Sequence, residues 1–327
     1  MRSWGDIVRQ GQGGRNDEDG DVVEKLEDIL TRFGNKIAAD DIDRVGQGAR
    51  RRLLPDRHPT PDFFVADILD WALKDDRHSM EHPIFSLSKN RDLQVRHYEH
   101  NGNSITVKPG ADGLATIWDK DVLIYLVSQL VEGLNQGRED AKSRKIRFRA
   151  YDYLVSTNRP IGGEHYRRLE AGLDRLKGTT IKTNVSAGGV RFKHAFGLID
   201  DWRSVERSPT DQRMIAVEVT ISEWLYNAVV AREVLTLHRD YFRLGGGLER
   251  RLYELARKHC GHQPKWTIST ELLHKKSGSA DLLKRFRAAI KRLVLSNELP
   301  DYCMKYDAES DQVSFFYQPK DLADQRP

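Results

Sequence analysis

The chain is 327 residues long, 39% of them hydrophobic and 31% charged, with a formal net charge of +4. This length favours two modest domains over one large core, and the absence of a run of about eighteen apolar residues excludes a membrane-spanning segment. No apolar segment with a cleavage site stands at the N-terminus, so we expect a cytoplasmic protein. The two cysteines, Cys260 and Cys303, lack the paired spacing of a zinc site, and we predict no metal and no cofactor.

Charge is unevenly distributed along the chain. Residues 1–80 hold 13 Lys and Arg against 17 Asp and Glu, whereas the remaining residues hold 40 against 32. A basic protein surface binds polyanions because its cations neutralise phosphates and release counterions. The region after residue 80 is therefore a candidate for nucleic-acid binding, although many enzymes are equally basic.

The first 80 residues are predicted to form an N-terminal extension. Residues 9–20 are too polar and glycine-rich to pack, and amphipathic helices are predicted at 22–33 and 63–73. Neither helix is long enough to form a domain, so we expect both to dock on the body or on a partner. The basic run Arg50–Arg52 between them is either a solvated linker or an arm that touches phosphates.

A first domain is predicted over residues 81–205. Short strands are expected at 105–107 and 114–118, followed by a long helix that Asp119 caps. A strand at 145–149, a helix at 151–156, a turn at 158–160 and a helix at 163–177 come next. Strands at 179–185 and 190–198 close the segment. The order helix, strand, helix, turn, helix, hairpin is typical of a winged helix-turn-helix.

The same order returns in a second domain, predicted over residues 206–320 and followed by a tail at 321–327. After an expected linker at 200–213, a strand is predicted at 214–220 and helices at 222–231 and 248–259. A strand at 265–268, helices at 269–275 and 280–296, and a hairpin at 302–306 and 312–317 complete it. The expected fold class is α+β, with two tandem winged-helix domains behind a partly flexible helical extension.

The two long helices align residue by residue. Residues 168–176 (RLEAGLDRL) align with residues 285–293 (RFRAAIKRL) at an offset of 117. Arg, Ala, Arg and Leu coincide, and the apolar pattern matches around them. Because the elements before and after these helices also correspond, the sequence indicates two related modules in tandem.

Helical phase gives the second long helix an exposed basic face. Lys284 and Lys291 lie opposite the apolar side, with Arg285 and Arg292 on one flank and Arg287 toward the other. Arg and Lys on a helix in the major groove can read guanine edges or hold phosphates, whereas the alternative is a solvated charged helix. The predicted DNA-binding residues are Lys284, Arg285, Arg287, Lys291 and Arg292, with Ser277 and Ser279 in the preceding turn, and Arg167, Arg168, Arg175, Arg191 and Lys193 in the first module.

The first module is predicted to bind DNA more weakly. Glu170 and Asp174 reduce the positive charge of its long helix, so that helix could instead form a protein–protein surface. In its hairpin, Arg191 and Lys193 are positioned to reach the DNA backbone or minor groove, whereas the second hairpin has an acidic tip.

Three blocks of sequence resemble the plasmid replication initiator protein A family of proteobacteria and, more distantly, the tandem winged-helix Rep initiators of iteron plasmids. They are residues 82–89 (HPIFSLSK), 115–125 (ATIWDKDVLIY) and 285–293, and the resemblance covers about residues 81–318. It implies binding to directly repeated double-stranded origin DNA, local duplex opening, and recruitment of the host initiator and replicative helicase. It also implies a monomer that initiates and a homodimer that represses its own gene at an operator.

Two other classes of protein remain open. A winged-helix transcriptional repressor would use the same fold without an initiator role. A tyrosine-type DNA strand-transfer enzyme is a remote alternative, because His165 and Arg168 match a His-x-x-Arg spacing. His165 aligns with Leu282 in the repeat and lies near the apolar stripe, which favours a structural role, and we predict no enzymatic activity.

Overall fold

The computed structural model describes residues 53–57, 66–68, 83–100, 103–187, 190–206, 214–231 and 234–318. The expected flexible segment at 9–20, the helix at 22–33, the run Arg50–Arg52 and the tail at 321–327 lie outside the described residues. Two hydrophobic cores organise the described part of the chain. The fold is mixed α/β, and its strands pair antiparallel within each sheet.

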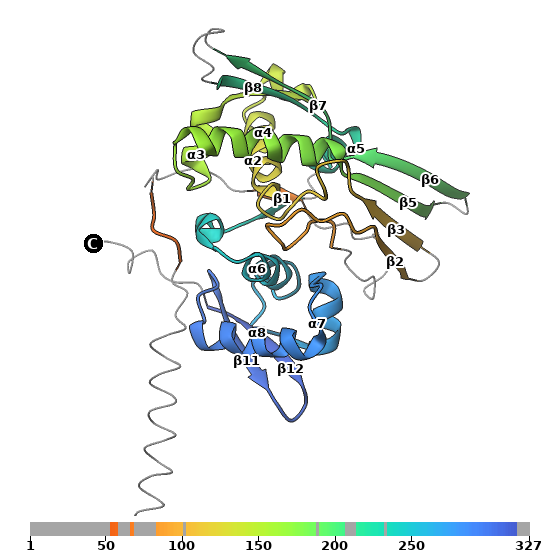
Figure 1. The fold of residues 1–327 in the computed structure, drawn as a ribbon, viewed down its shortest axis with the longest axis vertical. Helices are drawn as coiled ribbons and strands as arrows, with labels where there is room; N and C mark the ends of the chain where they lie inside the picture. Colours follow the sequence, from red (N-terminus) through yellow and green to blue (C-terminus); the bar gives the residue numbers. More distant parts are fainter. Residues whose placement is uncertain are drawn as a thin grey trace, which may run out of the picture. The chain divides into compact units, whose positions relative to one another are not determined.

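Helix α2 (Lys120–Asn135) runs through the first core (Figure 1). Its residues Val122, Leu126 and Leu130 recur at helical spacing and face the first core, whereas Ile124 packs in the second, so the helix is buried over most of its length. Around it pack α3 (Ala150–Ser156), α4 (Gly163–Gly178) and α5 (Glu223–Val230), and a 3-10 turn at Glu139–Lys142 follows its C-terminus. Ser222 caps α5 by accepting a hydrogen bond from the amide of Leu225.

Two antiparallel sheets belong to the first core. The order in one is β2 (Arg96–His100), β3 (Asn103–Lys108), β5 (Thr180–Ala187) and β6 (Val190–Gly197). In the other it is β4 (Lys145–Arg149), β8 (Met214–Ile221) and β7 (Ile199–Glu206). Val107 of β3 pairs with Ile181 of β5, and both side chains are fully buried. The alternation of apolar and polar residues in β3 therefore predicts correctly which of its side chains are buried.

Two expectations about this region are wrong. Strand β7 occupies residues 200–206 of the expected linker, whose residues 207–213 lie outside the described part of the chain. The strand and the helix expected at 214–220 and 222–231 are present as β8 and α5, and both pack in the first core. Their apolar side chains Val217, Val219 and Ile221 are buried there because β8 is the central strand between β4 and β7. The expected strand at 114–118 is an irregular buried segment, tied to residues 86–92 by backbone hydrogen bonds such as that of the Leu114 amide to the Asp92 carbonyl (2.7 Å).

The second core contains the elements that the sequence predicts for residues 247–317. They are α6 (Gly247–His259), β10 (Lys265–Ser269), α7 (Thr270–Ser277), α8 (Leu283–Ser296), β11 (Tyr302–Asp307) and β12 (Gln312–Tyr317), with a 3-10 helix, η2 (Arg239–Arg243), before them. The sheet order is β10-β12-β11. Phe286 and Ile290 of α8 are fully buried, as the helical phase predicts.

The two repeated modules share an element order but pair their strands differently. In the second core, β10 pairs with the hairpin strand β12. In the first, the corresponding strand β4 pairs with β8, and the hairpin β5–β6 pairs with β3 instead. A short strand β1 (Ala66–Ile68) pairs with β9 (Val234–Thr236), so the expectation of a helix at 63–73 is wrong for those residues.

Residues 53–57 form a strap that contacts both cores. Leu54 exchanges two hydrogen bonds with Arg243 of η2, through its amide (2.8 Å) and its carbonyl (2.7 Å). At the other end, the side chain of Asn158 accepts from the Arg57 amide (2.7 Å) and donates to the Pro55 carbonyl (3.1 Å). The strap therefore joins the turn between α3 and α4 to the second core.

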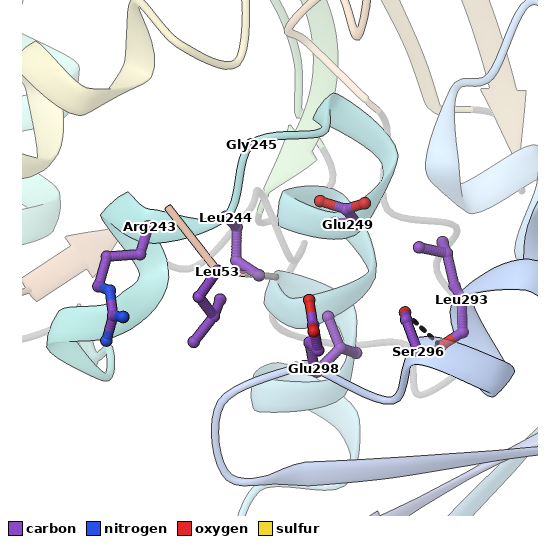
Figure 2. Close-up of a pocket in the computed structure, with 9 residues that line it drawn as sticks. Leu53, Arg243, Leu244, Gly245, Glu249, Leu293, Ser296 and Glu298 are labelled. Atoms are coloured by element: carbon purple, nitrogen blue, oxygen red, sulfur yellow. Dashed lines mark hydrogen bonds between the residues drawn. The ribbon is translucent and has the colours of Figure 1, made fainter. Parts of the chain in front are cut away.

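Leu53, the first residue of the strap, lies beside the C-terminal end of α8. Figure 2 shows it among the residues that line a small cavity, together with Glu249, Leu293 and Ser296. The volume of this cavity is about 10 Å³. A cavity of this size holds at most about one water molecule. Leu53 thus lines a small pocket that the second core forms beside the strap.

Candidate nucleic-acid interface

Helix α8 presents a basic face to solvent. Its side chains Lys284, Arg285, Lys291 and Arg292 are exposed, while Phe286 and Ile290 on the opposite side hold the helix to the core. Ala288 is exposed at the centre of this face, one turn from Lys284 and one turn from Lys291. A small residue there lets another surface approach the helix closely. The structure therefore places four of the predicted DNA-binding cations together on one helix.

Arg287 lies on the wing side of α8 and contacts Asp311 at the tip of the β11–β12 hairpin. Its Nη2 donates to Asp311 Oδ2 at 2.7 Å, and its Nε lies 3.1 Å from both carboxylate oxygens. This pairing holds the pKa of Asp311 down, at about 2. Arg287 therefore lies on a flank of α8, as the helical phase predicts, and is engaged there by a carboxylate.

The predicted serines shape the turn between α7 and α8. Ser277 is fully buried, and its hydroxyl donates to the His274 carbonyl (2.8 Å) and accepts from the Ser279 amide (3.2 Å). Ser279 in turn accepts from the Asp281 amide (3.3 Å). Gly278 between them adopts φ = 70°, a left-handed conformation that glycine enters without steric cost. These hydroxyls stabilise the turn that sets the direction of α8.

In the first module, Arg175 is engaged by Asp119. Its Nε and Nη2 donate to the two carboxylate oxygens at 2.8 Å each, and this hydrogen bonding raises the pKa of Arg175. Asp119 also accepts from the amide (2.8 Å) and hydroxyl (2.9 Å) of Thr116, so the prediction that its side chain caps α2 is wrong. Arg175 therefore fixes the position of α4 against the start of α2.

The other predicted residues of this module differ in their surroundings. Arg167 is exposed on α4, and Arg168 pairs with Glu164 one turn earlier, with both side chains mostly exposed. An exposed pair of this kind contributes little to stability and exchanges readily with other partners. Arg191 and Lys193 belong to strand β6, but their side chains lie outside the described part of the structure.

An open cleft of about 1010 Å³ lies along α4. Arg168 and Arg175 line it, and further cations come from other segments of the chain. These are Arg57, Lys89, Arg91, Arg159 and Arg250. They belong to the strap, the loop before β2, the turn before α4 and helix α6, which are far apart in the sequence, so no local pattern could have grouped them. The acidic residues of the cleft, Asp119 among them, offset part of this charge.

His165 also lines this cleft, but its Nδ1 is buried without a hydrogen-bond partner. Burial, reinforced by the neighbouring Arg168, lowers the pKa of His165. A neutral, half-buried imidazole fits the structural role that the repeat predicts for this position.

Buried charges connect α2 with α6. The carboxylate of Asp121 in α2 forms ion pairs with Nη1 of Arg250 (2.5 Å) and Nη2 of Arg159 (2.7 Å). The side chains of Asp121 and Arg250 are each no more than 3% exposed. Lys120 lies 3.0 Å from Glu254 of α6, whose Oε1 also accepts from the hydroxyl of Tyr241 (2.7 Å). Charges taken out of water need such close partners, and these contacts join the two cores at this point.

No group of three or more potential metal ligands occurs among the described residues. Cys260 is buried rather than solvated, and the neighbouring His259 stacks on Trp266 with ring centroids 4.6 Å apart. Within the same residues, no helix is both long and apolar enough to cross a membrane.

The fold resembles that of two solved structures. A crystal structure of domains 2 and 3 of RctB, in its selenomethionine form, matches with a TM-score of 0.53 at 13% identity, over 71% of this chain and 93% of the other. A second RctB domain 2–3 structure matches with a TM-score of 0.51 at 12% identity, over 73% and 96%. At these identities the likeness concerns the fold alone.

Sequence comparison identifies the family. The model of the replication initiator protein A family matches residues 74–304. A protein of Wigglesworthia glossinidia brevipalpis named "Putative replication protein" is 41% identical over 256 residues, covering 78% of this chain and 92% of the relative. The chain therefore belongs to the replication initiator protein A family, as its three sequence blocks suggest.

Proposed function

We propose that this protein is a plasmid replication initiator that binds directly repeated origin DNA and reads its sequence with helix α8. The observation that carries the proposal is the exposed face of Lys284, Arg285, Lys291 and Arg292 on a helix that follows a tight turn. Cations on such a face neutralise phosphates and donate to guanine edges in the major groove. Family membership supports the role in replication initiation.

The finer parts of the proposal follow the same reasoning. The second core is a winged helix in this view, because α7 and α8 are followed by a hairpin whose sheet order is β10-β12-β11. The first module is a modified winged helix that adds weaker contacts through Arg167, Arg168, Arg191 and Lys193. Duplex opening, recruitment of the host initiator and replicative helicase, and repression of its own operator by the homodimer belong to the proposal through the family.

The direct test is binding to the DNA that flanks the gene, by footprinting and titration. The double variant Lys284→Ala, Lys291→Ala should lose specific affinity by roughly 1–3 kcal/mol for each side chain that reads a base. The matched control is Arg147→Ala, Arg149→Ala, which removes two exposed cations from strand β4 of the first core. If the α8 double variant bound its site as tightly as the parent, α8 would not be the reading helix.

The competing function is a repressor without an initiator role. A plasmid that carries the origin and an inactivated copy of the gene separates the two. Loss of plasmid replication supports initiation, whereas stable maintenance with increased expression of a neighbouring gene supports repression alone.

We further propose that the protein is not catalytic. Incubating purified protein with supercoiled plasmid tests for DNA cleavage. Nicked or relaxed product would contradict the proposal and support the strand-transfer alternative. In that case Arg168, which now pairs with Glu164, and His165 would be the first residues to substitute.

A further inference from the structure

Asp311 joins the tip of the second hairpin to α8. Its carboxylate accepts hydrogen bonds from Nε and Nη2 of Arg287. It also accepts one, at 2.9 Å, from the hydroxyl of Tyr306 in strand β11. Its backbone carbonyl accepts from the amide and the hydroxyl of Thr270, the first residue of α7, at 2.9 Å each. Asp311 therefore connects α7, α8 and the hairpin.

Tyr306 extends this cluster to the exposed face of α8. Lys291 lies with its ammonium 5.2 Å from the centre of the Tyr306 ring, a distance at which cation and ring attract. The same tyrosine thus contacts the ammonium of Lys291 with its ring and donates a hydrogen bond from its hydroxyl to Asp311. Arg287, Asp311, Tyr306 and Lys291 form a continuous group, which we call the wing clamp.

The composition of the hairpin argues against a direct phosphate contact by its tip. Asp307 and Glu309 are both exposed there, and Asp307 folds the tip by accepting from the Glu309 amide (3.0 Å) and the Ser310 hydroxyl (2.6 Å). A carboxylate next to a phosphate is repelled. Arg287 faces this acidic tip rather than the centre of the exposed face, so its charge is largely compensated within the protein.

We propose that the wing clamp is a specificity-determining device, in which Arg287 and Asp311 position α8 and Lys291 on DNA without touching the DNA themselves. This inference rests on the proposed function, because it assigns roles within the same interface. Arg287 and Asp311 are positioning residues, and Lys284, Arg285, Lys291 and Arg292 make the contacts. The hairpin acts as a brace for the reading helix.

The test compares Arg287→Ala, Asp311→Asn, the double variant and Lys284→Ala in the full-length protein. Asn suits position 311 because its backbone has φ = 48°, a conformation that Asn tolerates. Specific and non-specific DNA affinities are measured at several salt concentrations. The logarithm of the binding constant falls linearly with the logarithm of the salt concentration, and removing one phosphate-binding cation makes this slope shallower by about 0.9.

We expect Arg287→Ala and Asp311→Asn to weaken specific binding by the same factor, about tenfold, with the double variant no weaker than either. The salt dependence should stay that of the parent for all three, whereas Lys284→Ala should make it shallower. The ratio of specific to non-specific affinity should fall for the clamp variants. Thermal melting of each variant identifies any weakening of binding that comes from unfolding alone.

Direct DNA contact by Arg287 would change affinity and salt dependence in a different way. If Arg287 contacts DNA, Asp311→Asn frees a cation and removes a repelling charge, so binding tightens, and Arg287→Ala makes the salt dependence shallower as Lys284→Ala does. That result, or clamp variants with parental specificity, would overturn the inference while leaving the proposed function intact. A parent protein that binds no origin fragment would overturn both.

Discussion

The arginines of the two long helices differ in role because they face different groups. Arg175 of α4 and Arg292 of α8 occupy equivalent positions in the repeat, yet Arg175 is held by Asp119 and Arg292 is exposed. Asp119 stands at the start of α2, and the residue at the start of the corresponding helix α6 is Gly246, which has no carboxylate. The repeat therefore preserves the arginine and changes its surroundings.

Among individual residues, Asp311 of the wing clamp should make stability depend on pH in the acid range. The pKa of Asp311 is about 2, against an ordinary value of 3.8. Because the folded state lowers this pKa, the clamp stabilises the fold fully above the ordinary value and loses that contribution as the pH falls from about 4 to about 2.

Thermal melts of the parent and of Asp311→Asn from neutral pH to pH 2 test this prediction. The two melting temperatures should differ most at neutral pH and converge as Asp311 is protonated. A difference that stays constant down to pH 2 would contradict the assigned pKa.

Among the larger elements, the strap shows how a short segment can join two packed regions. Besides the hydrogen bonds of Leu54, Pro55 and Arg57, Asp56 forms an ion pair with Arg239 of η2 at 3.0 Å. Neither the contact with Asn158 nor that with Arg239 is visible in the sequence, because the partners are about 100 and 180 residues away. Local patterns report periodicity within an element and carry no information on such distant partners.

Replacing Asn158 by Gly should release one end of the strap. Asn158 has φ = 55°, so Gly keeps the backbone conformation and removes only the two side-chain hydrogen bonds. We expect faster hydrogen exchange at the amide of Arg57, with the amide of Leu54, held by Arg243, changing less. Equal protection of Arg57 in parent and variant would show that Asn158 does not hold the strap.

Across the whole described chain, α2 contributes to both cores. Most of its apolar residues pack in the first core, whereas Ile124 packs in the second, and Asp121 pairs with Arg250 of α6. The division into domains at 205/206 stays a prediction, but the packing of β8 and α5 extends the first core beyond that point.

Asp121→Ala should be strongly destabilising, because it leaves Arg250 buried without its carboxylate. Breaking a buried ion pair from one side costs about 3–5 kcal/mol. Urea unfolding followed by fluorescence should show a clearly lower midpoint for this variant. The control is Glu139→Ala, which removes an exposed partner of Lys142 and should leave the midpoint unchanged. An unchanged midpoint for Asp121→Ala would mean that the buried pair does not hold the cores.

Local sequence patterns were sufficient to predict the elements of residues 247–317, the similarity of α4 to α8, and the family. Helical spacing and turn residues are local properties, so α6, α7, α8 and the final hairpin could be predicted from them. The same spacing identified Lys284, Arg285, Lys291 and Arg292 as an exposed face.

Which cations remain exposed and which strands pair depends on the folded chain. Arg175 and Arg287 are candidate DNA ligands by sequence, but Asp119 and Asp311 hold them in the structure. Strand β8 joins the first core because its neighbours there, β4 and β7, bury its apolar side chains. Ion pairs and sheet pairing require the approach of segments distant in the chain, and that approach is set by the packing of the whole fold.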